Sequence, residues 1–160
     1  MISYSKTKAE ITRRFDFPAE RVFDAWLRPE TAGLWLFTSE GSDPSGRIVE
    51  MDPRVGGKWR MVDRRGGVDY EADGEYLEID RPRRIVFTFR MKMFSDTTDT
   101  VIVEFAPSAN GGCAMRFTQE ITVPHDDDLS PADVERMLSE YKAGTVHGWN
   151  EMFDALAKKL

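Results

Sequence analysis

Residues 130–160, SPADVERMLSEYKAGTVHGWNEMFDALAKKL, decide the fold because they predict one long, uninterrupted helix. Ser130 suits the N-cap, Pro131 the first helical position and Asp133 the first turn. Nothing breaks the pattern before about Lys159, so the helix would have about 29 residues and extend about 43 Å. One side is apolar, as expected for a helix that packs on a second layer: Val134, Leu138, Tyr141, Thr145, Trp149, Met152, Phe153, Leu156 and Leu160.

The residues before this helix predict that second layer, an antiparallel sheet. From about residue 47 to 123, apolar and polar residues alternate with period two, and glycine-containing turns interrupt them at 65–67 and 110–112. The clearest strand alternates from Ile85 to Met93. The apolar parity shifts near Tyr76, which indicates a β-bulge. The predicted strands cover residues 47–52, 58–63, 70–80, 85–93, 101–105 and 115–119.

The N-terminal part adds one strand and two short helices. Residues 9–15 alternate as a strand, and Pro18 and Pro29 each suit the first turn of a short helix. The whole order predicts an α+β fold. In it, a curved six- to seven-stranded antiparallel sheet wraps around the long C-terminal helix, with the two short helices after the first strand.

The composition of the chain argues against several classes of function. The 160 residues are enough for about one domain, which we place at residues 1–160. The 22 basic and 28 acidic residues give a net charge of −6, which argues against a binder of duplex nucleic acid or of anionic membranes. The single cysteine, Cys113, excludes an internal disulfide. We expect a cytoplasmic protein without membrane insertion, because neither a signal-peptide pattern nor a membrane-spanning apolar run is present.

A strongly curved sheet that closes on one helix tends to leave a space between the two layers. Large, adaptable side chains alternate on the predicted inner face, and they would either fill this space or line a pocket. Parity also places the polar residues Arg13, Asp63, Glu78 and Gln119 inside, where each would join a buried network or contact a ligand. The predicted apolar lining comprises Trp35, Trp59, Met61, Tyr76, Phe87, Phe89, Met91, Met93, Val103, Met115 and Phe117.

Five segments carry a resemblance to a known family: ITRRFDFPAERVFDAW (11–26), VGGKWR (55–60), GEYLEI (74–79), PRRIVFTF (82–89) and GWNEMFDAL (148–156), together with Trp35. In order and spacing they resemble the START-like, birch-pollen-allergen-like (SRPBCC) superfamily, in the branch of homologues of the activator of heat-shock-protein-90 ATPase. The resemblance covers about residues 9–160. It implies a helix-grip fold, and it implies that Tyr141, Thr145 and Trp149 in the middle of the long helix roof a cavity.

Other candidate residues have simpler interpretations. His147 on the long helix is either an acid–base group facing the cavity or a polar helix position, and we favour the second. His125 with Asp126–Asp128 suggests a metal clip, but adjacent residues rarely converge on one ion, so we favour a solvated acidic loop. Cys113 has no visible activating partner, which indicates an inert thiol. The chain contains no phosphate-binding glycine motif and no nucleophile elbow.

These observations predict a small-molecule binding protein that holds an apolar or aromatic ligand between the sheet and the C-terminal helix. We expect neither a metal nor a cofactor, and we assign no catalytic residue. Two alternatives follow from the resemblance. One is an enzyme similar to the aromatase/cyclase members, and the other is a partner of a chaperone ATPase. A homodimer is compatible with the sequence, which does not identify the ligand.

Overall fold

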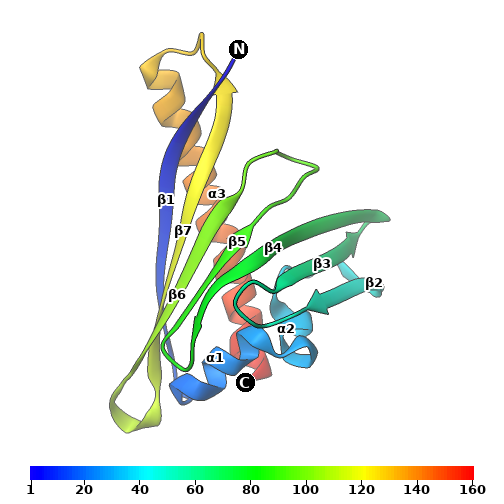
Figure 1. Ribbon diagram of the computed structural model, residues 1–160, viewed down its shortest axis with the longest axis vertical. Coiled ribbons are helices and arrows are strands. Elements are labelled where there is room, and N and C mark those ends of the chain that lie inside the picture. The colour runs from blue at the N-terminus through cyan, green and yellow to red at the C-terminus, as the bar shows by residue number, and fades with distance from the viewer.

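The computed structural model describes residues 1–160, which form one curved sheet, three α-helices and a short 3-10 turn (Figure 1). The elements are β1 (Ile2–Phe15), α1 (Ala19–Leu27), α2 (Pro29–Trp35), β2 (Ser42–Met51), β3 (Lys58–Arg65), β4 (Val68–Asp80), β5 (Arg84–Phe89), β6 (Asp99–Pro107), η1 (Ala109–Gly111), β7 (Cys113–Asp126) and α3 (Pro131–Lys159).

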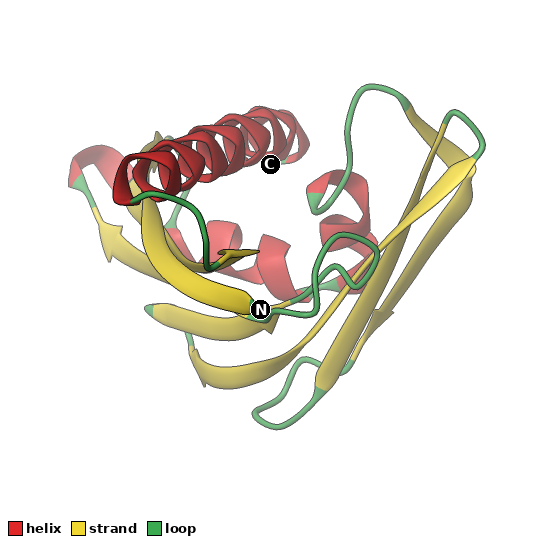
Figure 2. Cartoon of the chain, turned by 90° about the horizontal axis from the view of Figure 1, so that it is seen from above, coloured by secondary structure: helices red, strands yellow, loops and turns green.

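The strands form a seven-stranded antiparallel sheet in the order β1-β7-β6-β5-β4-β3-β2. Figure 2 shows the long helix α3 on the concave side of this sheet, and Figure 1 shows α1 and α2 in the lower part of the molecule. The predicted α+β helix-grip architecture is therefore confirmed. The cap of α3 is confirmed as well, because the Ser130 hydroxyl accepts a hydrogen bond of 3.1 Å from the Asp133 N–H.

The first strand is longer than the alternation indicated. β1 begins at Ile2 and pairs with β7 along its whole length, from Ile2 opposite Asp126 to Phe15 opposite Cys113. Residues 2–8 are mostly polar, and exposed residues alternate with half-buried ones, so they carry no buried apolar period that marks a strand. Their extended conformation comes from backbone pairing with β7, a partner more than a hundred residues away in the sequence.

The predicted bulge in β4 is present, and it overturns one prediction. Tyr76 pairs with Phe87, but the next pair is Glu78 with Val86, so Leu77 is the extra residue. The insertion reverses the side-chain parity, and Glu78 consequently lies on the outer face. There it pairs with Arg84 at 3.1 Å. The prediction that Glu78 points inward is therefore wrong.

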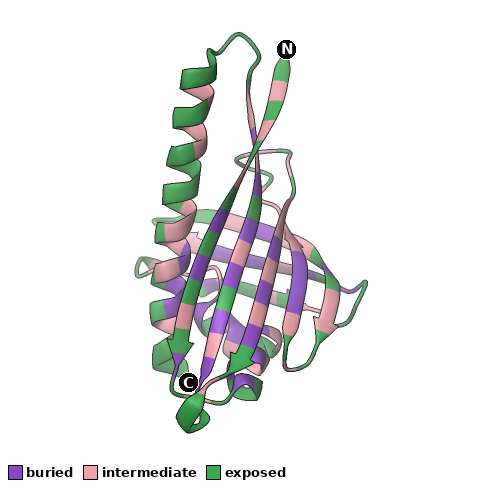
Figure 3. Ribbon diagram, turned by 90° about the vertical axis from the view of Figure 1, so that its left-hand side faces the viewer, coloured by how far each residue is buried: buried purple, intermediate pink, exposed green.

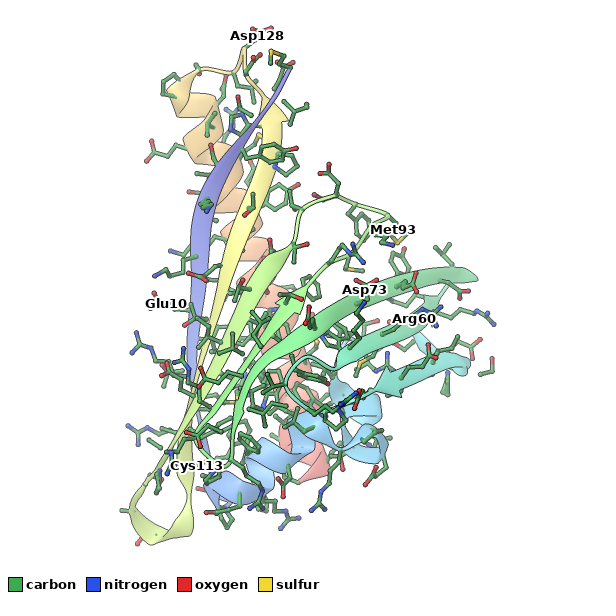
Figure 4. The ribbon with its side chains drawn as sticks, viewed as in Figure 1. Glu10, Arg60, Asp73, Met93, Cys113 and Asp128 are labelled. Atoms are coloured by element: carbon green, nitrogen blue, oxygen red, sulfur yellow. The ribbon has the colours of Figure 1, made fainter.

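The strand predicted from Ile85 to Met93 is too long. β5 ends at Phe89, and beyond it Arg90 makes only an isolated bridge to Asp73. Residues 91–98 then leave the sheet as the β5–β6 loop. Met93 lies in that loop and is 52% exposed, so its predicted place on the inner face is wrong (Figure 4). The prediction failed because Met91 and Met93 continue the alternation of β5 in the sequence, although this part of the chain has no strand to pair with.

Burial is concentrated in the lower part of the molecule as drawn in Figure 3, where α1, α2 and the C-terminal half of α3 meet the sheet. One apolar cluster of 26 buried residues occupies this region. The predicted apolar side of α3 is buried only at Trp149, Met152, Phe153 and Leu156. Its N-terminal half contacts a small second cluster through Met137 and Leu138 and is otherwise largely exposed. No helix of the structure is both long and apolar enough to cross a bilayer.

Candidate functional site

Four aromatic side chains mark the upper limit of the packed interior, with two of them stacked on the Phe37 ring and one packed edge-on against it. The Phe37 ring lies 5.1 Å from Trp59, 5.0 Å from Phe89 and 5.4 Å from Trp149, measured between ring centroids. Trp149 in turn packs on Phe117 at 4.5 Å. These rings come from the loop after α2, from β3, β5 and β7, and from α3. We call Phe37, Trp59, Phe89 and Trp149 the aromatic floor.

Phe37 reaches this position through an unusual backbone conformation. Its φ is +53°, in the left-handed region that residues other than glycine seldom adopt. Arg47 on β2 holds the loop, because its guanidinium donates to the carbonyl of Phe37 at 3.1 Å and to that of Gly33 at 3.2 Å. The conformational cost at Phe37 is therefore offset by hydrogen bonds to Arg47, by stacking on two aromatic rings and by an edge-on contact with a third.

An open cleft of about 620 Å³ lies between α3 and the β5–β6 loop. One wall of the cleft belongs to α3 and consists of Glu140, Tyr141, Gly144 and Thr145. Phe94 of the loop forms the other wall. Tyr141 is 46% exposed and Phe94 is 65% exposed, so two aromatic rings face solvent here. Thr145 stands one helical turn before Trp149 of the aromatic floor, on the same side of α3.

A chain of polar side chains runs beside the floor. The Trp149 indole N–H donates to Gln119 Oε1 at 2.8 Å, and Gln119 Nε2 donates to Asp99 Oδ2 at 2.8 Å. The other carboxylate oxygen, Asp99 Oδ1, accepts from the Thr122 N–H at 3.1 Å. Burial raises the pKa of Asp99 above its ordinary value, although both hydrogen bonds act in the opposite direction.

Most residues of the predicted lining lie inside the packed cluster. Phe89, Met91 and Thr145 are half-buried, and Tyr141 is exposed in the cleft. A narrow apolar pocket lined by Trp26, Leu27, Leu36, Trp59, Tyr76, Ile85 and Phe87 has a volume of about 10 Å³, room for about one water molecule. The fully buried part of the predicted lining comprises Trp35, Trp59, Met61, Tyr76, Phe87, Val103, Met115, Phe117 and Trp149.

The inward polar residues other than Glu78 are placed as parity predicts. Asp63 is only 2% exposed, and its carboxylate lies 2.8 Å from Arg65 Nε. Gln119 belongs to the polar chain described above. Arg13 is half-buried and pairs with Asp154 of α3 at 2.8 Å, which ties β1 to the helix. Asp63 and Arg13 thus join ion pairs at opposite ends of the sheet, away from Gln119.

A larger cleft, of about 740 Å³, opens on the outer face of the sheet between β2 and β5. Arg60 pairs there with Glu50 at 2.6 Å and also contacts Glu71, while Arg90 pairs with Asp73 at 2.9 Å. Figure 4 shows Arg60 and Asp73 on neighbouring strands. Because most of the side chains that line it are charged or polar, the outer cleft is a poor match for an apolar ligand.

The remaining candidates lie away from the aromatic floor. His147 is exposed and pairs with Glu151 at 2.9 Å along the helix. The His125 ring bonds to the Ser5 hydroxyl at 2.7 Å and to the Asp126 carbonyl at 2.9 Å. Cys113 is buried, and burial raises its pKa, as expected for an unreactive thiol.

Sequence reasoning did not single out three residues of this region. Asp99 has the parity of Val101 and Val103, so extending the β6 pattern by one step would have placed it inside. Phe94 was hidden by the prediction that β5 continues to Met93. The position of Phe37 depends on its positive φ, for which the sequence gives no signal.

Comparison with known proteins places the chain in a family. The family described as "Activator of Hsp90 ATPase homolog 1-like protein" matches residues 16–160. No curated protein matches the chain in a direct sequence comparison.

Solved structures extend the comparison. A protein of unknown function from Staphylococcus aureus superposes with a TM-score of 0.87 at 26% identity, covering 98% of this chain and 94% of its own. A protein from Rhizobium loti, at 24% identity and a TM-score of 0.71, covers 99% of both chains and supports the fold. An Hsp90 activator from Plasmodium falciparum, at 26% identity and a TM-score of 0.54, covers 70% of this chain and 71% of its own.

Proposed function

The chain belongs to the activator of Hsp90 ATPase homolog 1-like family, within the SRPBCC superfamily, and we propose that it is a small-molecule binding protein. The ligand is apolar or aromatic, and it lies in the cleft between the N-terminal half of α3 and the β5–β6 loop. The observation that carries this proposal is the pair of exposed aromatic rings, Tyr141 and Phe94, facing a cleft of about 620 Å³.

The packed interior moves the proposed site away from the place expected from the sequence. Trp149, Phe153 and their neighbours fill the space between the C-terminal half of α3 and the sheet. A ligand therefore binds above the aromatic floor rather than below it. The volume of the cleft lies within the range of about 300–1,000 Å³ that is typical of small-molecule sites, and Tyr141 and Phe94 supply its aromatic surface. Removing ligand and aromatic surface from water contributes about 25 cal/mol per Å² before the costs of association.

A second candidate function is interaction with a chaperone ATPase. The observation that favours it is the likeness to the Hsp90 activator from Plasmodium falciparum. An ATPase assay with purified Hsp90 and this chain at high concentration tests it, and an unchanged rate would count against this role. An enzymatic role similar to the aromatase/cyclases has less support, since Asp99 is the one half-buried acid beside the floor and no second acid–base group faces it.

The binding proposal is tested by filling the cleft. Gly144 lines the cleft, and a Cβ built there meets nothing within 4 Å, so Gly144→Trp inserts a large ring without backbone conflict. Ala143→Trp, one residue away and outside the cleft lining, is the matched control. The readout is the fluorescence of N-phenyl-1-naphthylamine, an uncharged probe that brightens in apolar surroundings.

We expect saturable binding to the unaltered chain and to Ala143→Trp, and a loss of affinity of about tenfold or more in Gly144→Trp. Equal binding by both tryptophan variants would place the probe elsewhere on the molecule and refute the proposed site. Native mass spectrometry of the purified protein, followed by denaturing extraction, would then identify the chemical class of any co-purified ligand.

A further inference from the structure

Glu140 is the only charged side chain that lines the cleft between α3 and the β5–β6 loop. The other lining residues are Phe94, Tyr141, Gly144 and Thr145. Glu140 is exposed, and no Lys, Arg or His nitrogen lies within 4.0 Å of its carboxylate. The wall of the cleft therefore carries one negative charge with which no side chain pairs.

Most of the other acids on α3 have a partner. Asp133, Glu151 and Asp154 each form an ion pair with a basic side chain. Glu135 is unpaired, but it lies five positions before Glu140, which is about 140° away around the helix, and it does not line the cleft. Glu140 is thus the one acid of α3 that is both unpaired and part of the cleft.

The aromatic rings of the cleft provide a surface that attracts cations, because the face of an aromatic ring carries partial negative charge. Tyr141 is 46% exposed. Phe94 stacks on Tyr70 at 6.1 Å between ring centroids and is still 65% exposed. Arg65 already illustrates this attraction, since its guanidinium carbon lies 4.2 Å from the centroid of the Tyr70 ring. The charge of Arg65 is itself paired with Asp63.

We propose that the ligand of this cleft carries an alkylated ammonium ion, which contacts the Glu140 carboxylate and the rings of Tyr141 and Phe94. This inference rests on the proposed function, because it names the chemical class of ligand for the same cleft. An alkylated nitrogen suits an open cleft better than a primary ammonium, which is strongly hydrated and loses more on leaving water. Its alkyl groups spread the charge over an apolar surface that packs on ring faces. The apolar remainder of the ligand extends along Gly144 and Thr145.

Two compounds of the same shape test the inference. Choline ends in a trimethylammonium group, and 3,3-dimethylbutan-1-ol has a neutral tert-butyl group in its place. Their binding is measured by NMR titration of the ¹⁵N-labelled chain at constant ionic strength. Glu140→Gln removes the charge of the cleft, and Glu135→Gln, the matched control, removes the same charge from another side of α3. Phe94→Leu removes one ring and keeps an apolar side chain.

We expect the unaltered chain to bind choline about fivefold more tightly than the alcohol, with the largest amide shifts in residues 140–145 and 91–98. Glu140→Gln and Phe94→Leu should each weaken the binding of choline about threefold and leave that of the alcohol unchanged. Glu135→Gln should change neither affinity. All three positions are exposed, so the variants are expected to fold.

The inference would be overturned if choline did not bind, or if it bound no more tightly than the alcohol. An equal loss in Glu140→Gln and Glu135→Gln would overturn it as well, because it would reveal only a general attraction of cations to a chain of net charge −6. The proposed function stands in each case if N-phenyl-1-naphthylamine binds to the unaltered chain and its binding is lost in Gly144→Trp. It falls if Gly144→Trp binds that probe as tightly as Ala143→Trp does.

Discussion

The two halves of α3 have different environments along one continuous helix. In the C-terminal half, Trp149, Phe153 and Leu156 are buried among rings from α1, α2 and the sheet. In the N-terminal half, Tyr141 is exposed and Thr145 is half-exposed. The C-terminal half contributes most of the packing that stabilises the fold, whereas the N-terminal half packs little and is the part to which we propose that a ligand binds.

The sheet explains this division. Figure 1 shows that β2, β3, β4 and β5 cross near the C-terminal half of α3, whereas the ends of β1 and β7 continue beside its N-terminal half. Only a small cluster of Ala9, Ile121 and Val123 therefore supports the upper part of the helix, through Met137 and Leu138. The β5–β6 loop stands across from the unsupported side, and the cleft lies between them.

The largest expected effect comes from Phe153→Ala. Phe153 is fully buried, and its ring lies 5.4 Å from Phe117 and 6.0 Å from Trp26. Removing the ring should lower the free energy of unfolding by about 3–5 kcal/mol, because burial is lost and a cavity remains. Urea titration followed by circular dichroism measures this change. A loss below about 1 kcal/mol would show that the C-terminal half is not the stabilising half.

A smaller effect is expected from Asp24→Asn, at the edge of the packed half. Asp24 on α1 receives two hydrogen bonds of 2.9 Å from Arg81 in the turn after β4. These bonds hold the pKa of Asp24 below its ordinary value of 3.8. Near neutral pH the variant should lose about 0.5–1 kcal/mol, as expected for a well-aligned ion pair near the surface.

The sign of the pH dependence follows from the lowered pKa. The stabilisation by Asp24 is fully present above pH 3.8 and is lost as the pH falls through the lower pKa of the folded state. The difference in stability between the unaltered chain and Asp24→Asn should therefore be constant from about pH 7 to about pH 5, and shrink below pH 4. Glu40→Gln, an exposed acid in the loop after α2, should show no such difference. A gap that widens in acid would contradict the assignment.

The smallest effect on stability is expected from Tyr141→Ala. This side chain is exposed, and alanine favours the helix, so the free energy of unfolding should change by less than about 0.5 kcal/mol. The affinity for N-phenyl-1-naphthylamine should nevertheless fall several-fold, because one wall of the cleft is lost. Unchanged binding, or a loss of stability comparable with that of Phe153→Ala, would remove the contrast between the two halves of the helix.

The fold could be predicted from local signals wherever those signals agree with the pairing. Neighbouring residues alone indicate the cap at Ser130, the two prolines at the starts of the short helices and the alternation of β3 to β7. The first half of β1 could not be predicted in this way, since residues 2–8 are extended only because β7 pairs with them. Glu78 was placed inside because it has the parity of Tyr76, and the bulge at Leu77, which lies between the two residues, reverses that parity.

The site was less predictable than the fold. Parity placed Asp63 and Gln119 inside and large side chains on the concave face, and their burial is confirmed, whereas their contact with a ligand stays a prediction. Periodicity cannot tell a packed interior from an open one, because aromatic residues fill a core as readily as they line a cavity. The aromatic floor depends on Phe37, whose backbone conformation is set by Arg47 and by three rings from β3, β5 and α3.

The pairing of the first strand with the last has a consequence for how the molecule forms during synthesis. β1 leaves the ribosome first, but its only partner strand, β7, is translated more than ninety residues later, and α3 follows β7. Contacts so distant in sequence form slowly, and the aromatic interior lacks Trp149 and Phe153 until α3 has been translated. The nascent chain therefore exposes the apolar face of a half-built sheet from the first strands until α3 emerges. The closing of α3 over the sheet is expected to be the last step of folding.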